Sequence, residues 1–174
     1  SGTPLIHYGF NLEASWKNFD IYALLQGAGM YTVQFSEVYA EVLWSKGANT
    51  PAYFYDRWRK EDPYNPNSKW VAGKWPATRL IQDTGAMYKE SNIWRRDASY
   101  LRLKTLELGY TLPDSILRKS GISNIRFYIN GYNLLTFCDS FVKAFDPEKV
   151  EGSYSAGMNY PLTKSFNIGF TANF

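Results

Sequence analysis

The sequence has very little of the chemistry on which most enzymes and metal proteins depend. It contains one cysteine and one histidine among 174 residues. A single cysteine excludes a disulfide within the chain, and one residue of each kind is too few for a zinc site or a Cys–His nucleophile. The acidic residues show no spacing that marks a general acid–base pair. We therefore expect no catalytic residue, no bound metal and no cofactor.

Long hydrophobic runs and runs of one charge are also missing. No stretch reaches the roughly 18 apolar residues that a transmembrane helix needs. The 19 basic residues barely outnumber the 16 acidic ones, and no run of Lys and Arg indicates a nucleic-acid partner. The chain opens with Ser1 and shows no signal peptide, so we expect a processed chain or part of a longer protein. The absence of such a run does not exclude a membrane β-barrel, because each of its strands needs only about ten alternating residues.

Aromatic residues are abundant instead, with 14 Tyr, 11 Phe and 6 Trp. Many of them recur at every second position. Between residues 6 and 16 the even positions are apolar and the odd positions are small or polar. This period of two predicts a strand with one apolar and one polar face.

Lys17 and Asn18 predict a two-residue hairpin loop, because Asn tolerates the positive φ that such turns need. The loop would put apolar pairs on one face of the hairpin: Trp16 with Phe19, Ala14 with Ile21, Leu12 with Ala23 and Phe10 with Leu25. It would put Ser15 opposite Asp20 and Glu13 opposite Tyr22 on the other face. The alternation of the second segment agrees with this register without having been used to choose it.

Three further strands are predicted at residues 98–112, 124–136 and 166–174. In the first of these strands, the apolar positions change from odd to even numbers midway. Leu101 and Leu103 are odd, whereas Leu106 and Leu108 are even, which indicates a bulge or a strand that leaves the lipid zone at one end. A short turn of helix is expected after Pro113, ending near Gly121.

The predicted connections alternate between short and long, and the long ones cover residues 32–97 and 137–164. Within them, residues 35–43 favour a short helix and residues 154–160 an extended stretch. Outer-membrane barrels have short periplasmic turns and long extracellular loops, so we expect both long connections outside the cell. Four aromatic residues at the short-turn end would form a periplasmic girdle: Trp16, Phe19, Tyr110 and Phe174. The expected fold is all-β, an antiparallel segment of a transmembrane β-barrel.

A soluble β-sandwich would show the same alternation, and a carbohydrate-binding domain that uses loop aromatics is the alternative function. Against it, the polar faces are rich in Gly, Asn, Ser and Thr, whereas soluble edge strands carry more charge. The candidate residues for substrate or partner contact are Trp44, Asp56, Arg57, Trp58, Trp70 and Trp75. The tryptophans would stack on sugars or partner side chains, or pack the long loop against itself. Asp56 and Arg57 also suit a solvated, mutually paired charge cluster.

Several strings of the sequence resemble the C-terminal barrel of SusC/RagA-like TonB-dependent transporters. The clearest is Ser99-Tyr100-Leu101-Arg102-Leu103-Lys104, followed by Leu108-Gly109-Tyr110. The others, in the order of the family, are Asp56-Arg57-Trp58, Asn92-Ile93-Trp94, Gly131-Tyr132-Asn133-Leu134-Leu135-Thr136, Asp146-Pro147-Glu148, Tyr160-Pro161 and the segment 166–174. Residues 1–50 match only in strand character.

The resemblance implies a multi-pass, non-enzymatic importer of oligosaccharides or peptides in the outer membrane of a Gram-negative bacterium. Its partners would be outer-membrane lipid, a SusD-like surface lipoprotein, and the rest of the barrel with its plug domain. The TonB complex would bind through an N-terminal part outside this chain. Such transporters have about 22 strands around a plugged lumen, and residues 1–174 would supply the last five. The resemblance also implies that Phe174 is an assembly signal for the outer-membrane insertion machinery.

Overall fold

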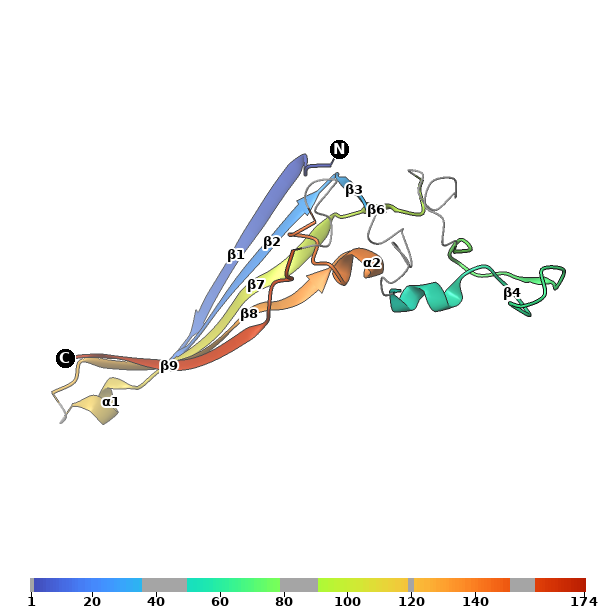
Figure 1. Ribbon diagram of the computed structural model, residues 1–174. Coiled ribbons are helices and arrows are strands. Elements are labelled where there is room, and N and C mark those ends of the chain that lie inside the picture. Colours follow the sequence, from blue (N-terminus) through green and yellow to red (C-terminus); the bar gives the residue numbers. More distant parts are fainter. Residues whose placement is uncertain (1, 36–49, 79–90, 119–120, 151–158) are drawn as a thin grey trace.

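The computed structural model describes residues 2–35, 50–78, 91–118, 121–150 and 159–174. Its main element is one twisted five-stranded sheet (Figure 1). The strands are β1 (Ile6–Trp16), β2 (Phe19–Gly29), β7 (Tyr100–Thr111), β8 (Asn124–Phe137) and β9 (Ser165–Asn173). They lie in this order, and all neighbours are antiparallel. The predicted antiparallel meander of five strands is thus confirmed.

The β1–β2 hairpin has the predicted register, from Trp16 opposite Phe19 to Phe10 opposite Leu25. One detail of the turn differs from the prediction. The positive φ, 55°, falls on Lys17, whereas Asn18 uses its side-chain amide to donate a 2.8 Å hydrogen bond to the carbonyl of Thr111. Asn18 therefore ties the turn to β7 rather than supplying the unusual backbone conformation.

Apolar side chains form continuous rows across the whole sheet. The first row lies next to the β1–β2 turn and is aromatic in every strand: Trp16, Phe19, Tyr110, Phe127 and Phe170. The second row is aliphatic: Ala14, Ile21, Leu108, Ile129 and Ile168. Since directly opposed residues share a face, both rows lie on the same side of the sheet.

A β-bulge explains the change of parity in β7. The register shifts between Leu103 and Thr105 against β8, and at the same level against β2. Lys104 is the extra residue, and Asn133 on β8 adopts a positive φ of 55° at this level. The bulge returns Leu101 and Leu103 to the apolar face although their numbers are odd. The prediction of a bulge is therefore confirmed.

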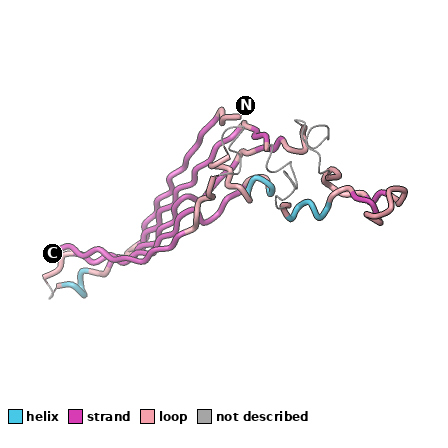
Figure 2. The backbone as a smooth tube through the Cα atoms, in the orientation of Figure 1, coloured by secondary structure: helices cyan, strands magenta, loops and turns pink. Residues whose placement is uncertain are grey.

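The two ends of the sheet differ (Figure 2). One end carries the β1–β2 turn and α1 (Asp114–Leu117), which is the helical turn expected after Pro113. The other end carries the two long connections. No helix among the described residues is long and apolar enough to cross a membrane.

The long connections contain short elements of their own. β3 (Thr32–Gln34) pairs with β6 (Arg95–Asp97) and closes the base of the first connection. Between them lie the 3-10 helix η2 (Ala52–Asp56) and the hairpin of β4 (Arg59–Lys60) and β5 (Trp70–Val71). The second connection contains α2 (Ser140–Lys143). The helix predicted at residues 35–43 lies, apart from Phe35, outside the described residues, as do positions 154–158 of the predicted extended stretch.

Candidate functional site

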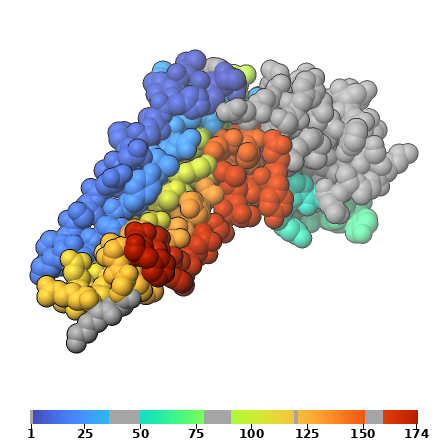
Figure 3. Space-filling view, turned by 90° about the vertical axis from the view of Figure 1, so that its left-hand side faces the viewer, coloured from blue at the N-terminus to red at the C-terminus, as the bar shows by residue number. Residues whose placement is uncertain are grey.

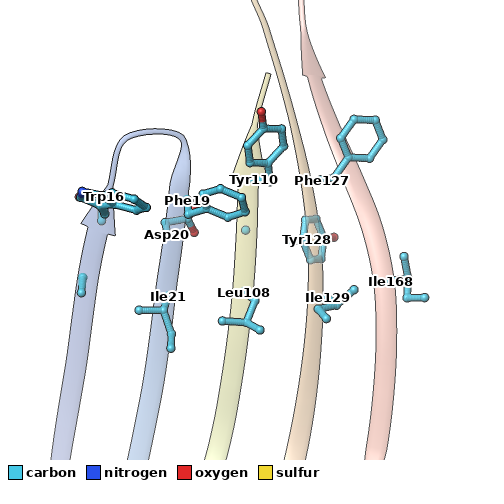
Figure 4. A pocket seen from close by; sticks show the side chains of 13 residues that line it. Trp16, Phe19, Asp20, Ile21, Leu108, Tyr110, Phe127, Tyr128, Ile129 and Ile168 are labelled. Atoms are coloured by element: carbon cyan, nitrogen blue, oxygen red, sulfur yellow. The ribbon is translucent and has the colours of Figure 1, made fainter. Parts of the chain in front are cut away.

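The apolar face of the sheet is exposed over its full width. Ile168 has 87% of its surface exposed, Phe166 74% and Phe170 68%. Figure 4 shows the aromatic residues near the β1–β2 turn and the aliphatic row beneath them, lining one shallow depression. Moving an Ile or Phe side chain from water into an apolar medium is favourable by about 1.5–3 kcal/mol. A face of this kind therefore requires an apolar environment.

The opposite face carries a polar network that crosses four strands. Arg126 binds the carboxylate of Asp20 with two side-chain nitrogens and donates a 2.8 Å hydrogen bond to Glu107. Glu107 also accepts a 3.1 Å hydrogen bond from Asn130, which in turn accepts one of 3.0 Å from Asn167. Each charge in the network has an opposite partner, so this face can stay polar without burying an unpaired ion.

Two glycines let this network lie flat against the sheet. A Cβ at Gly109 would collide with the guanidinium of Arg126 and the carboxylate of Asp20. A Cβ at Gly169 would lie 2.6 Å from the ring of Tyr128, its cross-strand partner. Glycine thus allows the side chains of the network to approach the backbone closely at these two positions.

A buried ion pair attaches the second long connection to the polar face. Arg102 and Asp146 are 2.5 Å apart with 4% of each side chain exposed. Arg102 also binds Glu148 at 2.8 Å, and Glu148 accepts a hydrogen bond of the same length from Lys104. Asp146 has a positive φ of 64° and accepts further hydrogen bonds from two backbone N–H groups. The Tyr31 hydroxyl donates a 2.7 Å hydrogen bond to the adjacent Pro147 carbonyl.

These contacts unite two strings that the sequence shows separately. Arg102 and Lys104 belong to the Ser99–Lys104 string, and Asp146 and Glu148 to the Asp-Pro-Glu string. Sequence reasoning missed the contact because the two strings lie far apart in the chain. Neither string indicates which distant residues it contacts. The opposite charges were the only available signal.

Most of the buried core of the described residues lies in the long connections, and the ends of β2 and β7 contribute the rest. Trp75 and Trp94 stack with ring centroids 5.2 Å apart, and they are 5% and 1% exposed. Phe54 and Phe141 pack against this pair. In this position the indole of Trp75 supports the loop and offers no free ring surface to a ligand. Cys138 packs at the edge of the same cluster, and burial raises the pKa of its thiol.

The other predicted contact residues lie near the hairpin β4–β5. Trp58 is 45% exposed and Trp70 55% exposed. The Asp56 carbonyl accepts a 3.0 Å hydrogen bond from the Trp75 N–H, and its side chain is exposed. The Arg57 guanidinium donates a 3.2 Å hydrogen bond to the Phe54 carbonyl. Trp44 lies outside the described residues. Trp58 and Trp70 thus keep ring surface available for a partner.

Comparison with known proteins adds a family to this geometry. The chain is 32% identical over 183 residues to TonB-dependent receptor P3 of Formosa agariphila, covering 99% of this chain and 16% of the relative. It is 29% identical over 189 residues to TonB-dependent receptor P26 of the same organism, covering 99% and 17%. No protein-family model matches.

Solved structures agree with these relatives. The RagAB peptide transporter matches with a TM-score of 0.68 and 27% identity, over 98% of this chain and 17% of that chain. The RagAB peptide importer in its "open-open" state matches with a TM-score of 0.68 and 26% identity, over 99% and 17%. These matches confirm the resemblance to SusC/RagA-like TonB-dependent transporters and the fold as a segment of their β-barrel. The chain spans about a sixth of the length of the proteins it matches.

Proposed function

We propose that this chain, as a segment of a SusC/RagA-like barrel, forms part of an outer-membrane importer for oligosaccharides or peptides. The apolar face of the sheet is the lipid-facing wall, and the polar network of Arg126 lines the lumen. The importer works with a SusD-like surface lipoprotein and draws energy from the TonB complex. It carries out no covalent chemistry, because the solute passes a displaced plug domain.

The observation that carries the proposal is the set of apolar rows, which cross all five strands and have no described residue packed on them. A soluble sandwich would need a second sheet on this face. Lipid satisfies the same surface directly, and the alternation of apolar and polar faces is typical of membrane barrels. The soluble carbohydrate-binding alternative gains no support from the described residues.

The edges of the sheet support a larger barrel. β1 and β9 end the strand order, and no other strand in the described ranges pairs with their outer sides. Figure 3 shows β1, in blue, along one margin of the molecule. Open sheet edges are not stable in the hydrocarbon region, because unpaired backbone groups find no water there. In the proposed transporter, neighbouring strands of the same barrel cover both edges.

Membrane fractionation and uptake test the proposal together. The full-length protein should stay with the outer membrane after washing with high salt and with carbonate, and should be released by detergent. Deleting its gene should abolish growth on one class of oligosaccharide or peptide. Purification of the full-length protein from buffer without detergent would show that the apolar face does not meet lipid.

A further inference from the structure

The hairpin at the tip of the first long connection carries an indole beside an ammonium group. Lys60 on β4 is opposite Trp70 on β5, and its Nζ lies 4.6 Å from the centre of the Trp70 ring. Directly opposed residues of two antiparallel strands share a face. The two side chains therefore form one continuous surface, with more than half of Trp70 exposed.

This surface is held rigid by the turn between the two strands. The Ser68 hydroxyl and the Asp62 carbonyl are joined by a 2.9 Å hydrogen bond, and the Tyr64 N–H donates one of 2.9 Å to the Asp62 carboxylate. Lys60 Nζ donates a 2.7 Å hydrogen bond to the Ser68 carbonyl. A surface fixed before binding loses less conformational entropy when a ligand arrives.

The hairpin lies beyond the end of the sheet from which both long connections leave. Figure 1 shows β4 and α2 at this end, with β4 furthest from the sheet. The second long connection meets the polar face here, because Asp146 after α2 binds Arg102 on β7. Residues 56–75 contain five basic and three acidic side chains. None of these eight forms an ion pair within the described part of the chain, so the hairpin offers positive charge to a ligand.

We propose that Lys60 and Trp70 form a contact site for a carboxylate-bearing solute at the entrance of the transporter. The inference rests on the proposed function and names the chemical class of its substrate. The half-buried Lys60 ammonium pairs with the carboxylate, and the exposed indole packs on the apolar face of the unit that bears it. Such a group belongs either to an acidic oligosaccharide or to an acidic peptide, and both sources share this chemistry.

The test is calorimetric titration of the full-length transporter, purified in detergent together with its lipoprotein. Hexagalacturonate is compared with maltohexaose, and an octapeptide containing four Glu with the same peptide containing four Gln. The wild type should bind one acidic probe about tenfold more tightly than its neutral counterpart. Lys60→Gln should abolish that preference, Lys60→Arg should keep it, and Trp70→Ala should weaken binding of the same probe by about tenfold. The acidic probe that binds identifies the source.

Two matched controls separate the site from general effects of charge and aromatic content. Arg59→Gln removes the neighbouring cation, which alternation places on the other face of the hairpin. Tyr64→Ala removes an aromatic side chain that is 94% exposed on the same turn. Neither substitution should change the affinity for the acidic probe. Equal losses for Lys60→Gln and Arg59→Gln would reduce the effect to non-specific attraction and overturn the site.

The remaining outcomes also decide the proposal. A wild type that shows no preference for either acidic probe overturns the substrate class. Loss of the lipoprotein from Trp70→Ala, with solute affinity unchanged, makes the hairpin a docking surface for the lipoprotein instead. Both of these outcomes leave the proposed transport function standing if deletion of the gene still abolishes uptake. Uptake that is unchanged by the deletion refutes the proposed function itself.

Discussion

At the scale of single residues, Arg102 does the most to join distant parts of the chain. Its side chain meets Thr136 on β8 and two carboxylates of the second long connection. Burying a charge is costly unless it is paired and hydrogen-bonded, and Arg102 fulfils both conditions. The second long connection is thereby attached to the polar face of the sheet.

Replacing Arg102 tests this attachment. Arg102→Ala leaves Asp146 buried without its cation, which typically costs about 3–5 kcal/mol. We expect residues 138–164 to become sensitive to protease while the strands stay protected. Limited proteolysis followed by mass spectrometry measures the effect. The control is Arg118→Ala, which removes an exposed cation that forms no ion pair with a described residue and should leave cleavage within residues 138–164 unchanged.

Phe174 gives a second prediction at this scale. The structure places it beyond the end of β9 with 91% of its surface exposed, whereas Phe170 takes the place in the aromatic row. Deleting Phe174 removes one side chain, worth about 1.5–3 kcal/mol if it is fully buried in the interface. A large barrel tolerates that loss once folded. We expect slow insertion and accumulation of the variant in the periplasm. Pulse labelling and fractionation measure both effects. Insertion at the wild-type rate would leave Phe174 as a girdle residue only.

At the scale of elements, the alternation of apolar and polar residues determines which substitutions each face of a strand tolerates. Leu12 lies in an apolar row that continues through Ala23, Leu106 and Phe166, and its neighbour Asn11 points to the polar face. The two positions differ by one residue along β1, yet they face lipid and lumen in the proposed barrel. They therefore form a matched pair for mutation.

We expect Leu12→Arg to destabilise the full-length barrel by about 2–4 kcal/mol, the cost of a cation near the middle of the lipid face. Asn11→Arg should cost far less, because the lumen is wet. Reversible unfolding in denaturant, or the temperature at which heat-modifiable gel mobility is lost, measures both variants. Equal destabilisation by the two substitutions would show that the faces have been assigned wrongly.

At the scale of the whole molecule, the proposed transporter would have the two ends of the sheet in different compartments. Both long connections leave from one end, and α1 and the β1–β2 turn lie at the other. The aromatic row lies at the turn end, as expected for a girdle at the periplasmic interface. We therefore expect the long connections, with their own buried aromatic core, to lie outside the cell.

Trypsin added to intact cells tests this orientation. We expect cleavage after Lys69 and Lys74, which are exposed on the hairpin of the first connection. Arg118, exposed at the opposite end, should be cut only after the outer membrane has been opened. Cleavage at Arg118 in intact cells, with the two lysines protected, would reverse the topology.

The sequence by itself determined the strands, the register of the first hairpin and the apolar face. Period-two alternation leaves only one choice of face, and a two-residue turn between Trp16 and Phe19 fixes the pairing, because a slip by one residue would exchange the faces. Even the bulge in β7 was visible, since Leu103 and Leu106 cannot both face lipid in an unbroken strand. These are local properties, and each can be followed along a few neighbouring residues.

Only the tertiary structure decided which parts of the long connections are buried and what they contact. Trp75 and Trp70 look alike in the sequence, yet Trp75 stacks on Trp94 inside the loop core and Trp70 lies exposed beside Lys60. Arg102 meets Asp146 across 44 positions of the chain. Irregular segments have no period from which a face can be read, so burial there depends on contacts between residues far apart in the sequence.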